Sequence, residues 1–79
     1  MEKYKVISIR GKTDKVNPAH EYILNKVVIL DKAKIHLGES LNLGPLRTSK
    51  VLSCDSEGFN IKIETEHTYY YFQLIYNST

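Results

Sequence analysis

Apolar and polar side chains alternate along most of this chain, and the alternation predicts a series of β-strands. Residues 3–10 alternate with one slip, at the apolar neighbours Val6 and Ile7. Residues 59–64 alternate without a break, so one face of that strand should meet a core and the other face solvent. Residues 69–76 alternate in the same way. The pattern is that of an all-β chain.

Turn signals connect the strands of the C-terminal third. Residues 55–58, Asp-Ser-Glu-Gly, end in glycine as a type I turn prefers. They predict a hairpin between a strand over residues 48–54 and a strand whose core face carries Phe59, Ile61 and Ile63. Residues 66–68 turn the chain again. Three consecutive strands therefore form an antiparallel meander.

The first half of the chain is less regular. Residues 11–19 are polar and predict a long surface loop. Residues 21–30 carry apolar positions that would also line one face of a helix. However, the β-branched run at residues 27–30 is bounded by turn-like pairs. We therefore favour two short strands, or one bent strand, over a helix.

Residues 35–43 form the next predicted element, in which Gly38 marks a bulge or a tight corner. Gly44-Pro45 ends it with a turn. The chain thus holds five to seven short strands. We expect a single domain over residues 1–79, folded as a small SH3-like barrel or a rolled antiparallel sheet. An OB-like barrel is the alternative.

Composition is that of an ordinary globular protein rather than a disordered one, with 42% hydrophobic and 25% charged residues. Cys54 is the only cysteine, so no internal disulfide can form. The sequence has no apolar run of membrane length, and residues 1–4 do not resemble a signal peptide. We therefore expect a cytoplasmic protein with no membrane partner.

The net charge of +2 is too small to indicate a nucleic-acid binder by itself, but its distribution is uneven. Residues 1–50 hold ten basic and five acidic side chains, which gives +5. Residues 51–79 hold one basic and four acidic side chains, which gives −3. The charges either decorate solvent-facing surfaces or form a basic and an acidic face that steer a partner.

The last predicted strand carries three consecutive tyrosines. Alternation places Tyr70 with Phe72 and Leu74 in the core, and Tyr69 with Tyr71 on the opposite face. Two exposed tyrosines on one face form an amphipathic platform for protein contact. They would equally stack on bases or on a nucleotide ring. The alternative is that they cover a second apolar layer, such as the long loop.

Arg47, Thr48, Ser49 and Lys50 form a polar cluster after the predicted Gly-Pro turn. Two cations and two hydroxyls suit a phosphate group, because arginine binds it bidentately and backbone amides after the turn would point outward. The spacing matches no Walker-type loop. The alternative is the polar start of a strand, in which Thr48 and Ser49 satisfy the amides of the turn.

Basic residues also gather around the predicted long loop, at Arg10, Lys12, Lys15 and Lys26. They form either a basic rim beside the tyrosines or a solvated loop. Histidines are scattered over three elements, and no Cys-x-x-Cys or His-x-x-x-His spacing occurs. We therefore expect no bound metal and no cofactor.

Cys54 and His67 are the one combination that would suit a nucleophile and its base. Such pairs arise by chance in most chains. We therefore expect that the protein is not an enzyme.

A larger pattern runs through the second half of the chain. It comprises a glycine corner, a Thr-Ser-x-Val segment, a hairpin, a threonine and an aromatic strand, represented here by Gly38-Glu39-Ser40-Leu41, Thr48-Ser49-Lys50-Val51, Glu64-Thr65 and Tyr70-Tyr71-Phe72. This resembles small bacterial and phage β-proteins with an SH3-like barrel. The resemblance implies a compact barrel without catalytic residues. It specifies no function, but phage proteins of this size are often inhibitors or sequestering proteins aimed at host machinery.

Our first hypothesis is a non-enzymatic protein-binding module, such as a phage or mobile-element inhibitor or accessory protein. Its contact surface would centre on Tyr69 and Tyr71, with Arg47 and Lys50 at the rim. The second hypothesis is a nucleotide or nucleic-acid binder that uses the same tyrosines for stacking and the same cations for phosphate. We also expect a homodimer, because an aromatic last strand at an open sheet edge would pair with another copy.

Overall fold

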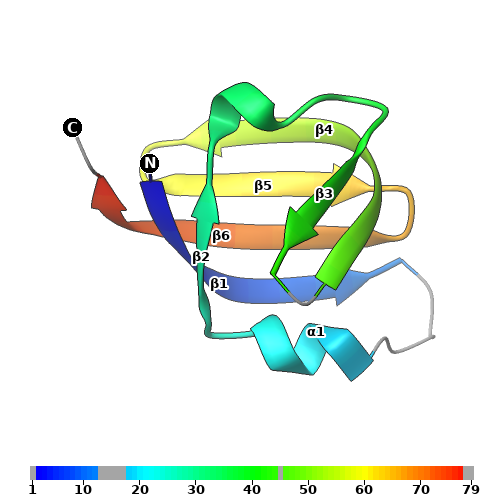
Figure 1. Cartoon of the computed structure of the whole chain (residues 1–79), viewed down its shortest axis with the longest axis horizontal. Helices are drawn as coiled ribbons and strands as arrows, with labels where there is room; N and C mark the ends of the chain where they lie inside the picture. Colours follow the sequence, from blue (N-terminus) through cyan, green and yellow to red (C-terminus); the bar gives the residue numbers. More distant parts are fainter. Residues whose placement is uncertain (1, 13–17, 45, 78–79) are drawn as a thin grey trace.

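Six antiparallel strands form one strongly bent sheet in the computed structural model of the chain, which describes residues 2–12, 18–44 and 46–77 (Figure 1). The strands are β1 (Glu2–Gly11), β2 (Val27–Leu30), β3 (Ser40–Leu43), β4 (Leu46–Glu57), β5 (Asn60–Thr65) and β6 (Thr68–Asn77). Their order in the sheet is β2-β1-β6-β5-β4-β3. The predicted all-β fold, a small barrel of five to seven strands, is confirmed.

The sheet closes on itself into a nearly complete barrel because its long strands bend. β4 pairs with β3 through its first five residues and with β5 through residues 51–57. β1 pairs with β2 at its start and with β6 along its whole length. Both strands carry register shifts, and such bulges increase the local bend and twist. As a result β2, β3 and the start of β4 cross in front of the other strands (Figure 1).

The inner face of the barrel holds a single apolar core. Tyr70 and Phe72 are buried there, as the alternation along the last strand predicts, and Leu74 packs against them. The other buried apolar side chains come from the remaining five strands and from the helix: Tyr4, Val6, Ile23, Leu30, Leu43, Leu46, Val51, Ile61 and Ile63. The strand periodicity thus identified the core face correctly.

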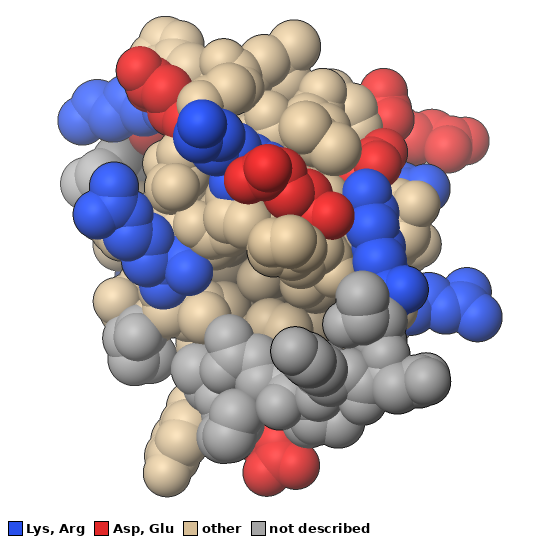
Figure 2. Space-filling view, turned by 90° about the vertical axis from the view of Figure 1, so that its right-hand side faces the viewer, with Lys and Arg blue, Asp and Glu red and all other residues tan. Residues whose placement is uncertain are grey.

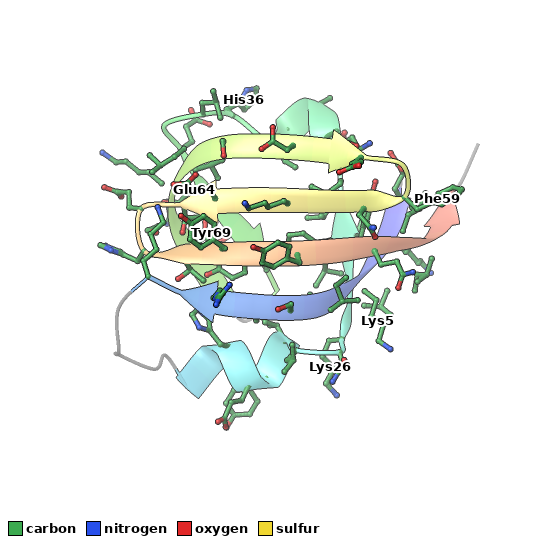
Figure 3. The ribbon with its side chains drawn as sticks, turned by 180° about the vertical axis from the view of Figure 1, so that it is seen from behind. Lys5, Lys26, His36, Phe59, Glu64 and Tyr69 are labelled. Carbon is green, nitrogen blue, oxygen red and sulfur yellow. The ribbon has the colours of Figure 1, made fainter. Side chains whose placement is uncertain are left out.

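Phe59 is an exception, because the prediction that it lies on the core face is wrong. Its side chain is 73% exposed (labelled in Figure 3). β4 continues to Glu57, which pairs with Asn60, so the hairpin turn is Gly58-Phe59 and not residues 55–58. Gly58 has φ 59°, the left-handed conformation that a two-residue hairpin requires. The tight turn leaves Phe59 at its tip, pointing into solvent.

A short helix, α1 (Pro18–Ile23), replaces the first of the two strands predicted within residues 21–30. β2 follows at residues 27–30 as expected. The helix brings Ile23 into the core and leaves Tyr22 exposed. It ends before Asn25, whose φ of 65° is a usual helix-terminating conformation. Tertiary packing at one end of the barrel thus decided an ambiguous apolar pattern.

The remaining connections agree in part with prediction. Gly38 forms the expected corner with φ 85°, and its N–H donates to the Val51 carbonyl at 2.8 Å. Gly44 has φ 74° at the predicted turn, while Pro45 lies outside the described residues. Most of the predicted loop over residues 11–19 also lies outside them. A 3-10 turn, η1 (Lys32–Lys34), links β2 to the corner.

The position of β6 corrects one further expectation. β6 lies between β1 and β5, in the middle of the sheet, so it offers no open edge to another copy. The edge strands are β2 and β3. Within the described residues, neither helix is long and apolar enough to cross a membrane.

Candidate binding face

The outer face of the long strands carries the two tyrosines singled out above (Figure 3). Tyr69 and Tyr71 project from β6 on the side opposite the buried Tyr70, and both are half-buried. Glu64 of β5 and Arg10 of β1 pair with Tyr69. We use "tyrosine face" for this surface, formed by Ile7, Ser8, Arg10, Lys12, Lys62, Glu64, Tyr69 and Tyr71.

Lysine side chains lie over both tyrosine rings. The Nζ atom of Lys62 lies 5.0 Å from the ring centroid of Tyr69 and 5.8 Å from that of Tyr71. The Nζ atom of Lys12 lies 4.9 Å from the Tyr69 centroid. These distances suit cation–π attraction.

An ion pair joins the two ends of this cluster. Lys12 Nζ donates to Glu64 Oε2 at 2.6 Å. The hydrogen bond from Lys12 lowers the pKa of the Glu64 carboxyl below its ordinary value. The backbone N–H of Lys12 donates to the His67 carbonyl at 2.9 Å, which fixes the end of β1 beside the β5–β6 turn. The lysine is therefore held near Tyr69 by both main chain and side chain.

A bulge in β1 adds an apolar side chain to the tyrosine face. Val6 pairs with Phe72, and Ser8 pairs with Tyr71, so Ile7 is inserted between them. In such a bulge two residues oppose one residue of the partner strand, and all three side chains lie on the same face of the sheet. Ile7 is accordingly 42% exposed and lies beside Tyr71. The slip in the sequence pattern at Val6-Ile7 corresponds to this bulge.

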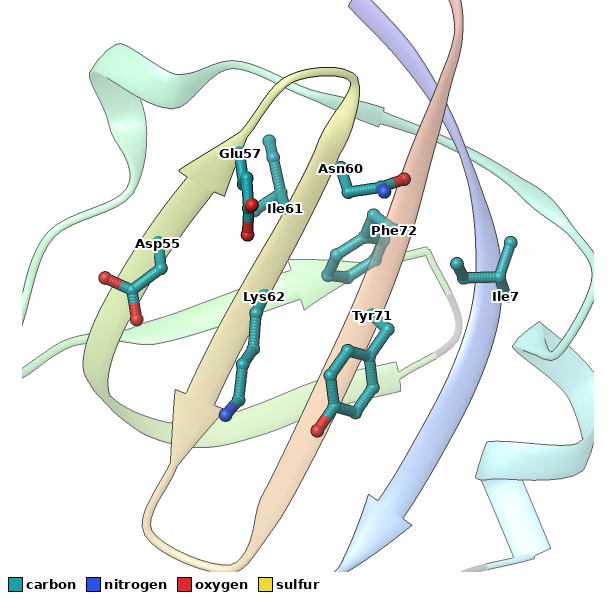
Figure 4. A pocket seen from close by; sticks show the side chains of 8 residues that line it. All are labelled: Ile7, Asp55, Glu57, Asn60, Ile61, Lys62, Tyr71 and Phe72. Carbon is teal, nitrogen blue, oxygen red and sulfur yellow. The ribbon is translucent and has the colours of Figure 1, made fainter.

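Tyr71 lines two shallow hollows. One has a volume of about 470 Å³ and is lined by Ile7 and Tyr71 together with Asp55, Glu57, Asn60, Ile61, Lys62 and Phe72 (Figure 4). The second, of about 510 Å³, lies on the β1 side and is lined by residues 7–10 and Tyr71. Tyr71 and Ile7 thus line both hollows, which meet at these two side chains.

Charges of both signs surround the tyrosines. Asp55, Glu57 and Glu64 lie with Arg10, Lys12 and Lys62 around the two rings. At the end of the barrel that carries the β5–β6 turn, basic and acidic side chains are likewise interspersed (Figure 2). The uneven distribution of charge along the chain therefore does not make the tyrosine face purely basic.

The structure separates the members of the predicted phosphate cluster. Thr48 is buried, and its hydroxyl accepts from Leu41 N–H at 2.9 Å and donates to the Ser49 carbonyl. Ser49 Oγ accepts from His67 N–H at 3.3 Å. Both hydroxyls therefore serve the fold, as the alternative reading of a polar strand start required.

Arg47 and Lys50 are both exposed but lie in different places. Lys50 N–H donates to Glu66 Oε1 at 3.2 Å, at the turn that precedes Tyr69. Arg47 pairs with Asn42 of β3, in the front part of the barrel. Both residues therefore pair with β3, Lys50 with Ser40 and Arg47 with Asn42, and Lys50 in addition reaches the β5–β6 turn that leads into Tyr69.

The predicted basic rim forms with a different membership. Arg10 and Lys12 lie beside Tyr69 as expected, whereas Lys26 precedes β2 and Lys15 lies outside the described residues. Lys62 was missed as a member of the site. The signal was present, because strand alternation around the turn at residues 66–67 places Lys62 opposite Tyr71.

Cys54 and His67 are far apart. His67 contacts Ser49, which precedes Cys54 by five residues on β4, so about 15 Å of extended strand lies between them. Burial raises the pKa of the Cys54 thiol, which opposes formation of a thiolate. Among the described residues, no three His, Cys, Asp or Glu side chains are grouped to hold a metal ion.

No family model, curated protein or solved structure matches this chain. The geometry of the tyrosine face is accordingly the basis for the function proposed below.

Proposed function

We propose that the protein is a non-enzymatic protein-binding module that contacts its partner through the tyrosine face. The observation that carries this proposal is that Tyr71 and the exposed Ile7 lie side by side on the outer face and line two adjoining hollows. Tyrosines provide a large contact area at low entropic cost, and hot spots of protein interfaces are enriched in them. The two hollows beside Tyr71 would each accept a side chain of the partner.

The chemistry of the face favours a protein partner over a nucleic acid. Asp55, Glu57 and Glu64 would repel a phosphate backbone. A stacked base would also have to displace Lys12 and Lys62 from the rings that they cover. A mixed arrangement of charges suits a protein surface of complementary pattern. Binding of a nucleotide or an oligonucleotide is therefore an outcome that the test below distinguishes.

A module of this kind acts by occupying the surface of its partner. That mode of action fits an inhibitor or accessory protein, of the sort encoded by phages and mobile elements. Lys50 would contribute at the rim, since it lies near the turn that leads into Tyr69. Arg47 would contribute only to a contact on the other side of the barrel.

The test is affinity capture from a lysate of the cells in which the chain is produced. Three baits are compared: the unaltered protein, the Tyr69→Ala/Tyr71→Ala variant and a Leu37→Ala control. Leu37 is a suitable control because it is a large apolar side chain that is 67% exposed and lies outside the tyrosine face. We expect a protein that the unaltered bait and the control retain and that the double variant loses. Equal recovery by all three baits would rule out this surface.

A second measurement addresses nucleic acid. Labelled single-stranded oligonucleotides and a panel of nucleotides are titrated into the protein at low and high salt. We expect no saturable binding. Binding that weakens steeply with salt and is lost in Tyr69→Ala/Tyr71→Ala would instead assign the tyrosine face to nucleic acid.

A further inference from the structure

We propose a second interaction site at the open seam between β2 and β3, which receives an extended, acidic segment of a partner protein as an added strand. This site is independent of the tyrosine face. β2 and β3 are the two edges of the sheet and face each other at the front of the barrel (Figure 1). Each edge strand pairs on one side only. Open strand edges bind extended segments through main-chain hydrogen bonds.

The backbone of β2 presents free hydrogen-bonding groups at two positions. Val6 N–H donates to the Lys26 carbonyl, and the Val6 carbonyl accepts from Asn25 N–H, so both groups of Val6 point toward the β2 side. Because the N–H and C=O groups of every second residue point to the same neighbouring strand, those of Tyr4 point toward Val28, its partner in register. The N–H and C=O groups of Val27 and Ile29 consequently point away from β1, into the seam.

An apolar hollow of about 540 Å³ lies along this edge. It is lined by residues 26–29, by Tyr22 and Ile23 of α1, and by residues 42–44. Val27 and Ile29 project to one face of β2 and Val28 to the other, so a hollow that touches all three follows the edge itself. Val27 and Ile29 are 52% and 54% exposed. A bound strand would cover these β-branched side chains while its backbone paired with theirs.

Charge determines the kind of segment that fits. Lys26 is the one charged side chain among the described residues that line the hollow. Lys5 pairs with Val27, and Arg47 pairs with Asn42, so a cation lies beside each edge strand at the end that carries the hollow, while Glu2 pairs with Leu30 at the other end of β2. Figure 3 shows Lys5 and Lys26 on the same side of the molecule. A segment of alternating β-branched residues flanked by glutamates satisfies both the apolar hollow and these cations. A second copy would bring its own Lys26 to the seam.

The test is an NMR titration of the isotope-labelled protein with two synthetic peptides. Both alternate valine and threonine, and they carry either glutamates or lysines at their ends. Ile29→Pro removes an N–H that points into the seam and leaves the β1–β2 ladder intact, since proline is tolerated at such edge positions. Ile29→Val is the matched control, because it keeps the N–H. Lys26→Glu reverses the local charge without changing the backbone.

We expect the glutamate-flanked peptide to shift the amide signals of Val27 and Ile29 saturably. Ile29→Pro should weaken this binding by about three- to tenfold, as the loss of a main-chain hydrogen bond implies, and Ile29→Val should not. Lys26→Glu should reverse the preference between the two peptides, which tests the site even if Ile29→Pro fails to fold. No shift at either amide, or equal binding by Ile29→Val and a folded Ile29→Pro, would overturn the proposal. Concentration-dependent shifts without peptide would assign the seam to a second copy and overturn it as well.

Discussion

The ring nitrogen Nε2 of His20 lies 3.2 Å from the hydroxyl oxygen of Tyr70, and the two rings meet edge to face with centroids 5.7 Å apart. His20 belongs to α1 and Tyr70 to the central strand β6. Their hydrogen bond satisfies the polar end of a tyrosine that is otherwise buried in the core. The contact therefore docks the helix on the end of the barrel.

The first prediction concerns pH. Burial lowers the pKa of His20 below its ordinary value of 6.5. The unfolded chain therefore binds a proton more readily than the folded one, so this contribution to stability is complete above about pH 6.5 and is lost as the pH falls toward the folded pKa. We expect urea unfolding to show lower stability at pH 5.5 than at pH 7.5. His20→Gln should flatten this difference, whereas the exposed control His36→Gln should preserve it. If His20→Gln loses as much stability between pH 7.5 and pH 5.5 as the unaltered protein does, His20 is not the source of this pH dependence.

The second prediction separates folding from binding within the tyrosine triplet. Tyr70 is 2% exposed, so Tyr70→Ala should cost about 3–5 kcal/mol of unfolding free energy, comparable to the total of about 4–12 kcal/mol typical of a domain this size. Tyr71→Ala removes a half-buried ring and should cost about 1 kcal/mol or less. Urea denaturation measures both. Similar losses from the two substitutions would mean that the outer ring is structural.

The third prediction concerns the β5–β6 turn. Thr65 is fully buried, and its hydroxyl donates to the Thr68 carbonyl at 3.0 Å and accepts from Thr68 N–H at 3.1 Å. Thr65→Val keeps the shape but leaves both groups of Thr68 without this partner, so it should cost about 1–3 kcal/mol. Thr65→Ser keeps the hydroxyl and is the control, with a smaller loss from the missing methyl group. Equal stability of Thr65→Val and the unaltered protein, measured by urea unfolding, would argue against this role.

The fourth prediction tests the revised hairpin. Phe59 lies at the tip of the turn and is 73% exposed, so Phe59→Ser should change the unfolding free energy by about 0.5 kcal/mol or less. Ile61→Ser places a hydroxyl in the core and removes a buried side chain, so it should cost several kcal/mol, about the range of large core truncations. Thermal and urea unfolding compare them directly. A large loss of unfolding free energy in Phe59→Ser would mean that Phe59 lies on the core face, as simple alternation predicts.

Much of the candidate site follows from local rules. Alternation along residues 69–76 separates Tyr69 and Tyr71 from Tyr70, and the structure agrees. The slip at Val6-Ile7 marks the bulge that turns Ile7 outward. The same alternation, continued around the tight turn into β5, pairs Lys62 with Tyr71. These features depend on neighbours in sequence or across one hairpin, so the side-chain period of two is enough to predict them.

Other features depend on partners that are distant in the chain. The helix at residues 18–23 docks through Ile23 in the core and through the contact of His20 with Tyr70, fifty residues further along the chain. The hydroxyls of Thr48 and Ser49 suited a phosphate in isolation, but they are used by Leu41 N–H and His67 N–H. Arg47 and Lys50 are three residues apart and both pair with β3, but Lys50 lies at the end of that pairing, where its N–H reaches Glu66 of the β5–β6 turn.

The sequence by itself determined the all-β class, the core side of β5 and β6, and the shared outward side of Tyr69 and Tyr71, because the alternation of a pleated strand is a local property. Tertiary structure alone decided the order of the strands. β1 pairs with β6 across the chain, which places the tyrosine strand in the middle of the sheet and leaves β2 and β3 as its edges. Such long-range pairing depends on the closure of the barrel around one core, and no local pattern specifies it.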